Sequence, residues 1–245
     1  PYLMGALSRW PDDSRVAPQD WLIRQLSGEE VLPLLIARKV VLRDLWFGPG
    51  FRKLTRSAAL SNCVILQIHG GDGATSLVTD LEDEESWLTR IETLRIYNVP
   101  LEDEHAIRLV TSKQLARLRE LHLDYTRVGA PTLEAILSSP MATSLETLGL
   151  QQANLSGARG LFGELRNLQA LKSLEFGSAE LGPEHIEALA DSVAPANLEA
   201  LSLRGNRARD HGVRELARGR FFTNLTALDL GNNQVGSPGA RALAE

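Results

Sequence analysis

A short hydrophobic frame recurs along this chain at an almost constant spacing. Six copies of the frame L-x-x-L-x-L begin at Ile91, Leu118, Leu145, Leu171, Leu198 and Leu225. Successive copies start 27, 27, 26, 27 and 27 residues apart, and two weaker copies begin at Leu42 and Cys63. A register that is kept over most of a chain indicates a stack of equivalent structural units.

Each copy of the frame predicts a short strand that is followed by a helix. Because side chains alternate along a strand, Leu121 and Leu123 should enter the core while His122 points outward. Between frames the apolar residues change to helical spacing, as in Leu133–Leu137. One unit buries too little apolar surface to fold alone, so the units should stack with strands on one face and helices on the other.

Two C-terminal stretches carry a family resemblance. "LSLRGNRARDHGVRELA" (201–217) and "LDLGNNQVGSPGARALAE" (228–245) resemble the helix-bearing intracellular leucine-rich repeats of ribonuclease inhibitor, the Ran GTPase-activating protein and NOD-like receptors. The resemblance covers residues 60–245. It implies an α/β leucine-rich-repeat solenoid, a right-handed βα horseshoe with a parallel concave sheet and a helical convex side. The motif asparagine occurs only at Asn206 and Asn233, so a buried asparagine ladder is expected only near the C-terminus.

The first forty residues lie outside this frame. Ser27 and Glu30 have capping-box spacing and predict a helix, and Pro18 and Trp21 indicate a shorter helix before it. Residues 1–40 are therefore predicted to form a helical N-terminal cap. Residues 41–245 are predicted to form a leucine-rich-repeat domain of about eight repeats, the first two irregular. The chain begins with Pro1 and stops within a helical pattern, so a truncated C-terminus is expected.

Large polar and aromatic residues gather at the strand positions predicted to face outward in the N-terminal half of the repeats. Tyrosine and arginine are enriched where proteins bind one another. The pattern predicts a protein-binding patch on the concave face. An alternative is that exposed strand positions must be polar and that the aromatic rings only shield the sheet. The candidate residues are Gln67, His69, Arg95, Tyr97, Asn98, His122, Asp124, Tyr125, Gln151 and Gln152.

The sequence carries no pattern that predicts catalysis, a cofactor site or a metal site. His69 and His122 fall two strands apart, about 10 Å, which is too far for one zinc ion. Cys63 occupies a leucine position and is expected to be a buried thiol rather than a nucleophile. "GGDGATS" (70–76) lacks the G-K-[ST] ending of a phosphate-binding loop.

Charge and cysteine content limit the classes of partner and the cellular location that we expect. The net charge of -5 and the sequence pI near 5.6 argue against a nucleic-acid or acidic-lipid partner. No apolar run has the length of a membrane span. One cysteine cannot form an internal disulfide, which favours a reducing, cytoplasmic location. The acidic stretches at 80–85 and 101–105 are expected on the helix side as solvated faces.

These observations predict a non-catalytic recognition or scaffold module that binds a protein partner on its concave face. The family resemblance leaves two alternatives open. One is a GTPase-activating or regulatory subunit of the Ran type. The other is the recognition domain of a larger multidomain enzyme or receptor.

Overall fold

The computed structural model describes residues 15–26, 37–43, 56–71, 77–78, 87–219 and 224–244. Within these residues nine strands form a single sheet in the order β1 to β9, and every neighbouring pair is parallel. The strands are β1 Val16–Ala17, β2 Lys39–Arg43, β3 Ile65–His69, β4 Thr93–Tyr97, β5 Glu120–Asp124, β6 Thr147–Gly149, β7 Ser173–Glu175, β8 Ala200–Ser202 and β9 Ala227–Asp229.

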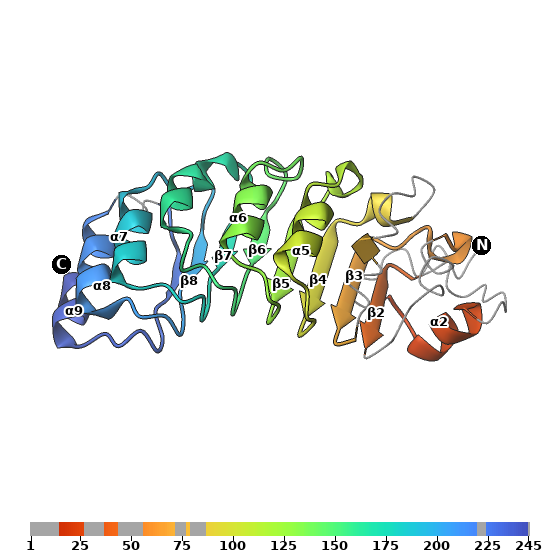
Figure 1. Cartoon of the computed structure of the whole chain (residues 1–245), viewed down its shortest axis with the longest axis horizontal. Coiled ribbons are helices and arrows are strands. Elements are labelled where there is room, and N and C mark those ends of the chain that lie inside the picture. Colours follow the sequence, from red (N-terminus) through yellow and green to blue (C-terminus); the bar gives the residue numbers. More distant parts are fainter. Residues whose placement is uncertain are drawn as a thin grey trace.

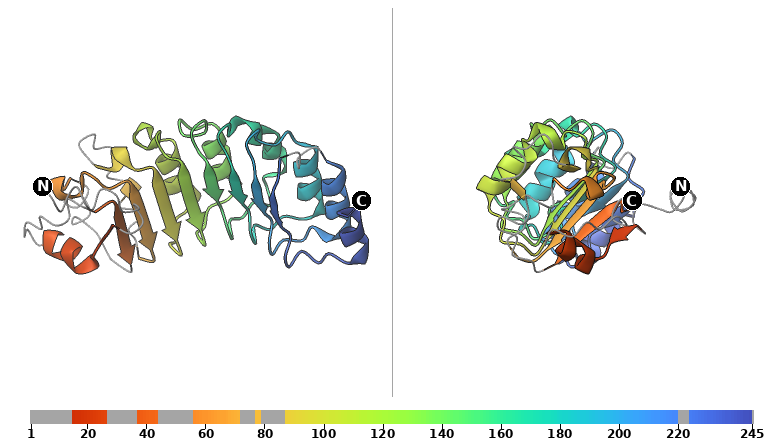
Figure 2. Two further views of the ribbon diagram at one scale, coloured as in Figure 1. Left: turned by 180° about the vertical axis from the view of Figure 1, so that it is seen from behind. Right: turned by 90° about the vertical axis from the view of Figure 1, so that its right-hand side faces the viewer.

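Helices return the chain from each strand to the next and cover one face of the sheet. The α-helices are α2 Gln19–Leu26, α5 Asp103–Val110, α6 Ala130–Leu137, α7 Pro183–Asp191, α8 Arg209–Arg218 and α9 Ser237–Ala242. The 3₁₀ helices are η3 Ala58–Leu60, η4 Trp87–Arg90, η5 Lys113–Leu115 and η6 Arg159–Asn167. Figure 1 shows the result as an elongated, shallow arc, and the end-on view in Figure 2 separates the sheet from the helix layer.

The core is one aliphatic layer between the sheet and the helices. Leu121 and Leu123 are fully buried, as the frame predicts. Their neighbours in register are the frame residues of adjacent strands, for example Leu94 and Leu148 beside Leu121. The frame therefore works as a ladder, in which each leucine packs on its counterparts in the flanking repeats. The predicted α/β leucine-rich-repeat solenoid is confirmed by this arrangement.

A left-handed backbone residue follows the strand in repeat after repeat. This residue turns the chain away from the sheet towards the next helix, and glycine and asparagine adopt its conformation most readily. Its φ lies between 52° and 73° in each case. The residues are Gly70, Asn98, Tyr125, Gln152, Ser178, Gly205 and Asn232.

The asparagine ladder lies at the C-terminal end, where the sequence predicts it. Asn206 Nδ2 donates to the carbonyl oxygens of Phe176 and Leu203, and its Oδ1 accepts from the amides of Ala179 and Leu181. Asn233 Nδ2 likewise donates to the carbonyl of Leu203. These bonds satisfy buried backbone groups in the turns between adjacent repeats.

The predicted strand register of the first repeat is wrong. Leu42 was expected to open its frame, but β2 places Leu42 beside Ile68, at the end of the frame, and Val40 beside Leu66. The frame is therefore shifted by five residues and begins at Ala37. The rest of the copy expected at Leu42, residues 44–47, lies outside the described residues. The sheet also extends to β1, within the segment predicted as a cap.

The described part of that N-terminal segment contains a helix where one is predicted. Helix α2 begins directly after Pro18 and includes Trp21, which is partly buried against the core. The second predicted helix, at Ser27 and Glu30, lies outside the described residues. The boundary at residue 40 stays a prediction.

One connection differs from the helical pattern of its neighbours. The segment after β6 forms the 3₁₀ helix η6, in which Phe162 is fully buried and its ring centroid lies 6.4 Å from that of Phe176. Gly160 and Gly163 disfavour an α-helix here. This repeat is also one residue shorter than its neighbours, and a 3₁₀ helix advances farther per residue than an α-helix.

Candidate functional site

The parallel register brings the predicted site residues together on the concave face. Gln67, Arg95 and His122 lie side by side on β3, β4 and β5. His69, Tyr97 and Asp124 form the next row on the same three strands. Because every strand is parallel and the pairing has no offset, residues spaced by one repeat become direct neighbours.

An ionic network joins β4 and β5. Arg95 Nε donates to Glu120 Oε1 at 2.6 Å, and the Nε2 atom of His122 lies 3.1 Å from the same oxygen. His122 Nδ1 lies 3.0 Å from Asp124 Oδ2. The imidazole of His122 is therefore held between two carboxylates that are two residues before it and two residues after it.

The network keeps His122 charged at neutral pH. Burial by itself would lower the pKa of His122, but hydrogen bonds to Asp124 and Glu120 raise it to about 9. Burial by itself would raise the pKa of Glu120, but hydrogen bonds from His122 and Arg95 lower it to about 2. Since both imidazole nitrogens carry a proton in the charged form, each can donate to one of the carboxylates.

The structure corrects the expectation that His122 and Asp124 are exposed. His122 is 8% exposed and Asp124 is 1% exposed. The cause lies one strand away, where Gly149 pairs with His122. A Cβ atom at Gly149 would lie 2.2 Å from His122 Nδ1, so the missing side chain leaves the space that the imidazole fills. His122 and Asp124 therefore stabilise the concave face and contribute little surface that a partner could contact.

The network continues to β7 through Gln151. The backbone amide of Gln151 donates to Asp124 Oδ1 at 2.8 Å, and its Nε2 donates to Glu175 Oε2 at 2.8 Å. Glu120 and Glu175 were not among the predicted site residues. Strand alternation could have found Glu120, because it lies two residues before His122 and so shares its face.

Aromatic rings form a second feature of the face. The ring centroid of Tyr97 lies 5.0 Å from that of His69 and 6.1 Å from that of His122. Burial, followed by the charge of Asp124, raises the pKa of Tyr97 to about 12. The two histidines are thus separated by a tyrosine ring rather than brought to a common centre.

The exposed part of the patch is a rim formed by Asn98, Tyr125 and Gln152. All three side chains are exposed, and Tyr125 is 48% exposed. They occupy the left-handed position of three successive repeats, with φ values of 52°, 57° and 61°. Asparagine is common in this conformation, whereas a bulky residue there is an outlier. An exposed aromatic ring on a strained backbone is a feature that the packing of the fold does not require.

The described residues contain neither a metal-binding cluster nor a reactive thiol. Across the described ranges, no three His, Cys, Asp or Glu side chains converge in a way that could hold a metal ion. Burial raises the pKa of the Cys63 thiol to about 12, and its Sγ donates to the carbonyl of Ala37. This thiol stays protonated and therefore unreactive at neutral pH. In the part of the chain that the structure describes, no helix combines the length and apolar character needed to cross a bilayer.

The acidic stretch at 101–105 makes contacts that hold two successive repeats together. Asp103 Oδ1 accepts from the backbone amides of Gly129 at 2.8 Å and Thr132 at 3.2 Å, and so caps the first turn of α6. Glu102 pairs with Arg127 of the next repeat at 2.9 Å. The other acidic stretch, at 80–85, lies outside the described residues.

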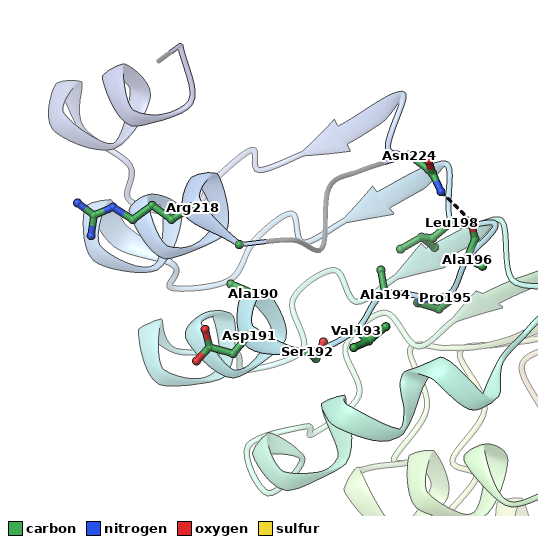
Figure 3. Close-up of a pocket in the computed structure, with 11 residues that line it drawn as sticks. Ala190, Asp191, Ser192, Val193, Ala194, Pro195, Ala196, Leu198, Arg218 and Asn224 are labelled. Carbon is green, nitrogen blue, oxygen red and sulfur yellow. Dashed lines mark hydrogen bonds between the residues drawn. The ribbon is translucent and has the colours of Figure 1, made fainter.

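A cavity of about 680 Å³ lies where α7 and α8 return towards the sheet (Figure 3). Small side chains of the loop between α7 and β8 form most of its described wall, and Asn224 Nδ2 closes one side by donating to the carbonyl of Ala196 at 2.8 Å. Among its described lining residues, Asp191 and Arg218 are charged. The cavity does not adjoin the concave patch, and its described wall contains no catalytic grouping.

One family model and several solved structures are similar to this chain. A family model described as a leucine-rich repeat matches residues 223–244. An internalin from Listeria monocytogenes shares 14% identity with a TM-score of 0.47, over 88% of this chain and 62% of that one. A structure of the Rad7–Elc1 complex from yeast shares 14% identity with a TM-score of 0.41, over 99% of this chain and 77% of that one. No curated protein matches the sequence.

The recurring frame and the parallel sheet together define the fold. The chain folds as an α/β leucine-rich-repeat solenoid with its strands on one face and its helices on the other, and residues 223–244 match a leucine-rich-repeat family model.

Proposed function

We propose that this solenoid is a non-catalytic recognition module that binds a protein partner through its concave face. The observation that supports this proposal is the exposed rim of Asn98, Tyr125 and Gln152 next to the partly buried ionic network around His122. The network fixes the face before binding, so a partner would meet a preorganised surface and lose less conformational entropy. Tyr125 offers ring area with a polar tip, as interface anchors commonly do.

The experiment removes the rim while keeping its backbone conformation. Tyr125→Asn and Gln152→Asn are combined, because asparagine adopts the left-handed conformation readily. Ser178→Asn is the matched control, since Ser178 occupies the same position one repeat further on and is exposed. Each variant and the wild type are used to capture proteins from an extract of the native cells, and captured proteins are identified by mass spectrometry.

We expect at least one protein that the wild type and Ser178→Asn retain and the double variant loses. With that protein purified, the double variant should bind at least about tenfold more weakly, as expected for loss of interface anchors. Equal capture by all three proteins, with each folded by circular dichroism, would place the binding surface elsewhere.

We further propose that the repeats are of the ribonuclease-inhibitor-like, helix-bearing subtype. Helices α5, α6, α7 and α8 are eight to ten residues long in repeats of 26 or 27 residues, which supports this assignment. We also propose a cytoplasmic location, with which the buried, protonated thiol of Cys63 is compatible. Fractionation of the native cells would test the location directly.

A further inference from the structure

We propose that a groove between α8 and α9, on the helix side of the solenoid, binds an acidic peptide segment of a partner protein. The groove encloses about 450 Å³. Arg214, Ala217 and Arg218 line it from α8, and Pro238, Arg241 and Ala242 line it from α9. Figure 1 shows these two helices side by side at the C-terminal end of the arc, on the side away from the strands.

The three arginines present a concentration of positive charge on a chain whose net charge is -5. Arg214 and Arg218 lie one helical turn apart on α8, and Arg241 follows Arg214 by one repeat of 27 residues. All three side chains are exposed. Neighbouring helices pack about 8–10 Å apart, so the arginines of α8 and α9 flank the same groove.

Little within the described part of the chain neutralises these charges. Arg214 Nε donates to the backbone carbonyl of Asp210, and neither Arg214 nor Arg241 forms a salt bridge with a described residue. Arg218 lies 3.5 Å from Glu215, but its side chain remains 74% exposed. Figure 3 shows Arg218 extending outward from α8.

The fold itself does not require arginine at these positions. The residues one repeat earlier, Glu187 and Asp191 on α7, are acidic, although α7 packs in the same layer as α8. The same helical positions thus tolerate either sign of charge. The change from acidic to basic between α7 and α8 is therefore independent of core packing.

A run of carboxylates fits this groove better than a single phosphate. Compact phosphate sites commonly use the free amides at a helix N-terminus. At α9 the amides of Gly236 and Gly239 already donate to Asp210 Oδ1, at 2.7 Å and 3.0 Å. The guanidinium groups are instead distributed along two helices above Ala217 and Pro238. Such spacing suits side-chain carboxylates presented in sequence by an extended peptide.

The test measures the binding of fluorescent peptides by anisotropy at low ionic strength. The probe is a short peptide of alternating Glu and Ala, and it is compared with a Gln–Ala peptide and with a Gln–Ala peptide that carries one phosphoserine. The protein variants are Arg214→Glu with Arg241→Glu, and the matched control Arg159→Glu, an exposed arginine on η6. A milder pair, Arg214→Gln with Arg241→Gln, replaces the charge reversal if that variant does not fold.

We expect the wild type to bind the Glu–Ala peptide about tenfold more tightly than the Gln–Ala peptide, with a preference that declines as salt is added. The double variant should lose this preference, and Arg159→Glu should keep it. The proposal is overturned by equal affinity for the two peptides or by an equal loss in Arg159→Glu. Preference for phosphoserine without preference for glutamate would overturn it in favour of a phosphate site.

Discussion

A substitution at Tyr125 should separate the contribution of this residue to stability from its contribution to partner binding. Its backbone φ is 57°, a region that costs an ordinary residue about 1–2 kcal/mol. Its side chain is 48% exposed, so its removal sacrifices little packing. Tyr125→Asn should therefore leave the free energy of unfolding unchanged or raise it, by up to about 1 kcal/mol, while weakening partner binding.

The assay is urea denaturation followed by circular dichroism, with wild type and variant at the same pH. The reverse exchange in the preceding repeat, Asn98→Tyr, is the matched control, because Asn98 has the same conformation with a φ of 52°. It should lower the free energy of unfolding by about 1 kcal/mol. If Tyr125→Asn instead destabilises the protein by more than about 1 kcal/mol, the ring supports the fold and the strain argument for a binding role is refuted.

Two further predictions concern His122, the buried centre of the ionic network. Gly149→Ala should lower the free energy of unfolding by about 3 kcal/mol in urea denaturation, because the added Cβ atom displaces His122 from Asp124. The control Gly160→Ala adds its Cβ atom to open space and should lower the free energy of unfolding much less. Because the pKa of His122 is about 9 when folded and near 6.5 when unfolded, its charge stabilises the protein fully below about pH 6.5 and is lost as pH rises through about 9. The urea midpoint of the wild type should fall over that interval, a fall absent from His122→Gln; identical pH profiles would contradict the assigned charge.

Periodicity in the sequence determines the architecture. Spacings of 26 and 27 residues and strict alternation around Leu121 and Leu123 suffice to predict parallel strands over one aliphatic layer. They suffice because each repeat contacts mainly its neighbours, so a local pattern already specifies the long-range contacts. Asn206 and Asn233 are predicted for the same reason, since their partners lie in the adjacent turn.

The first repeat shows where local pattern ceases to determine register. The segment from Ala37 to Phe47 offers apolar residues at two possible settings of the frame. Only the hydrogen-bonded pairing with β3 selects the one in which Val40 lies beside Leu66. Sequence spacing cannot rank two settings that both fill the frame with apolar residues.

The functional face depends still more on tertiary structure. Strand alternation places His122 on the concave side, but its burial and charge depend on Glu120, Asp124 and the empty space at Gly149, one repeat away. The strained backbone of Tyr125 likewise follows from the turn that successive described repeats make, not from a preference of tyrosine. The sequence alone therefore determined which side chains lie on the concave face of the sheet. Only the packing of these side chains against neighbouring strands decided which of them are buried and which remain exposed. Burial and pKa depend on an environment to which several repeats contribute, so no single repeat specifies them.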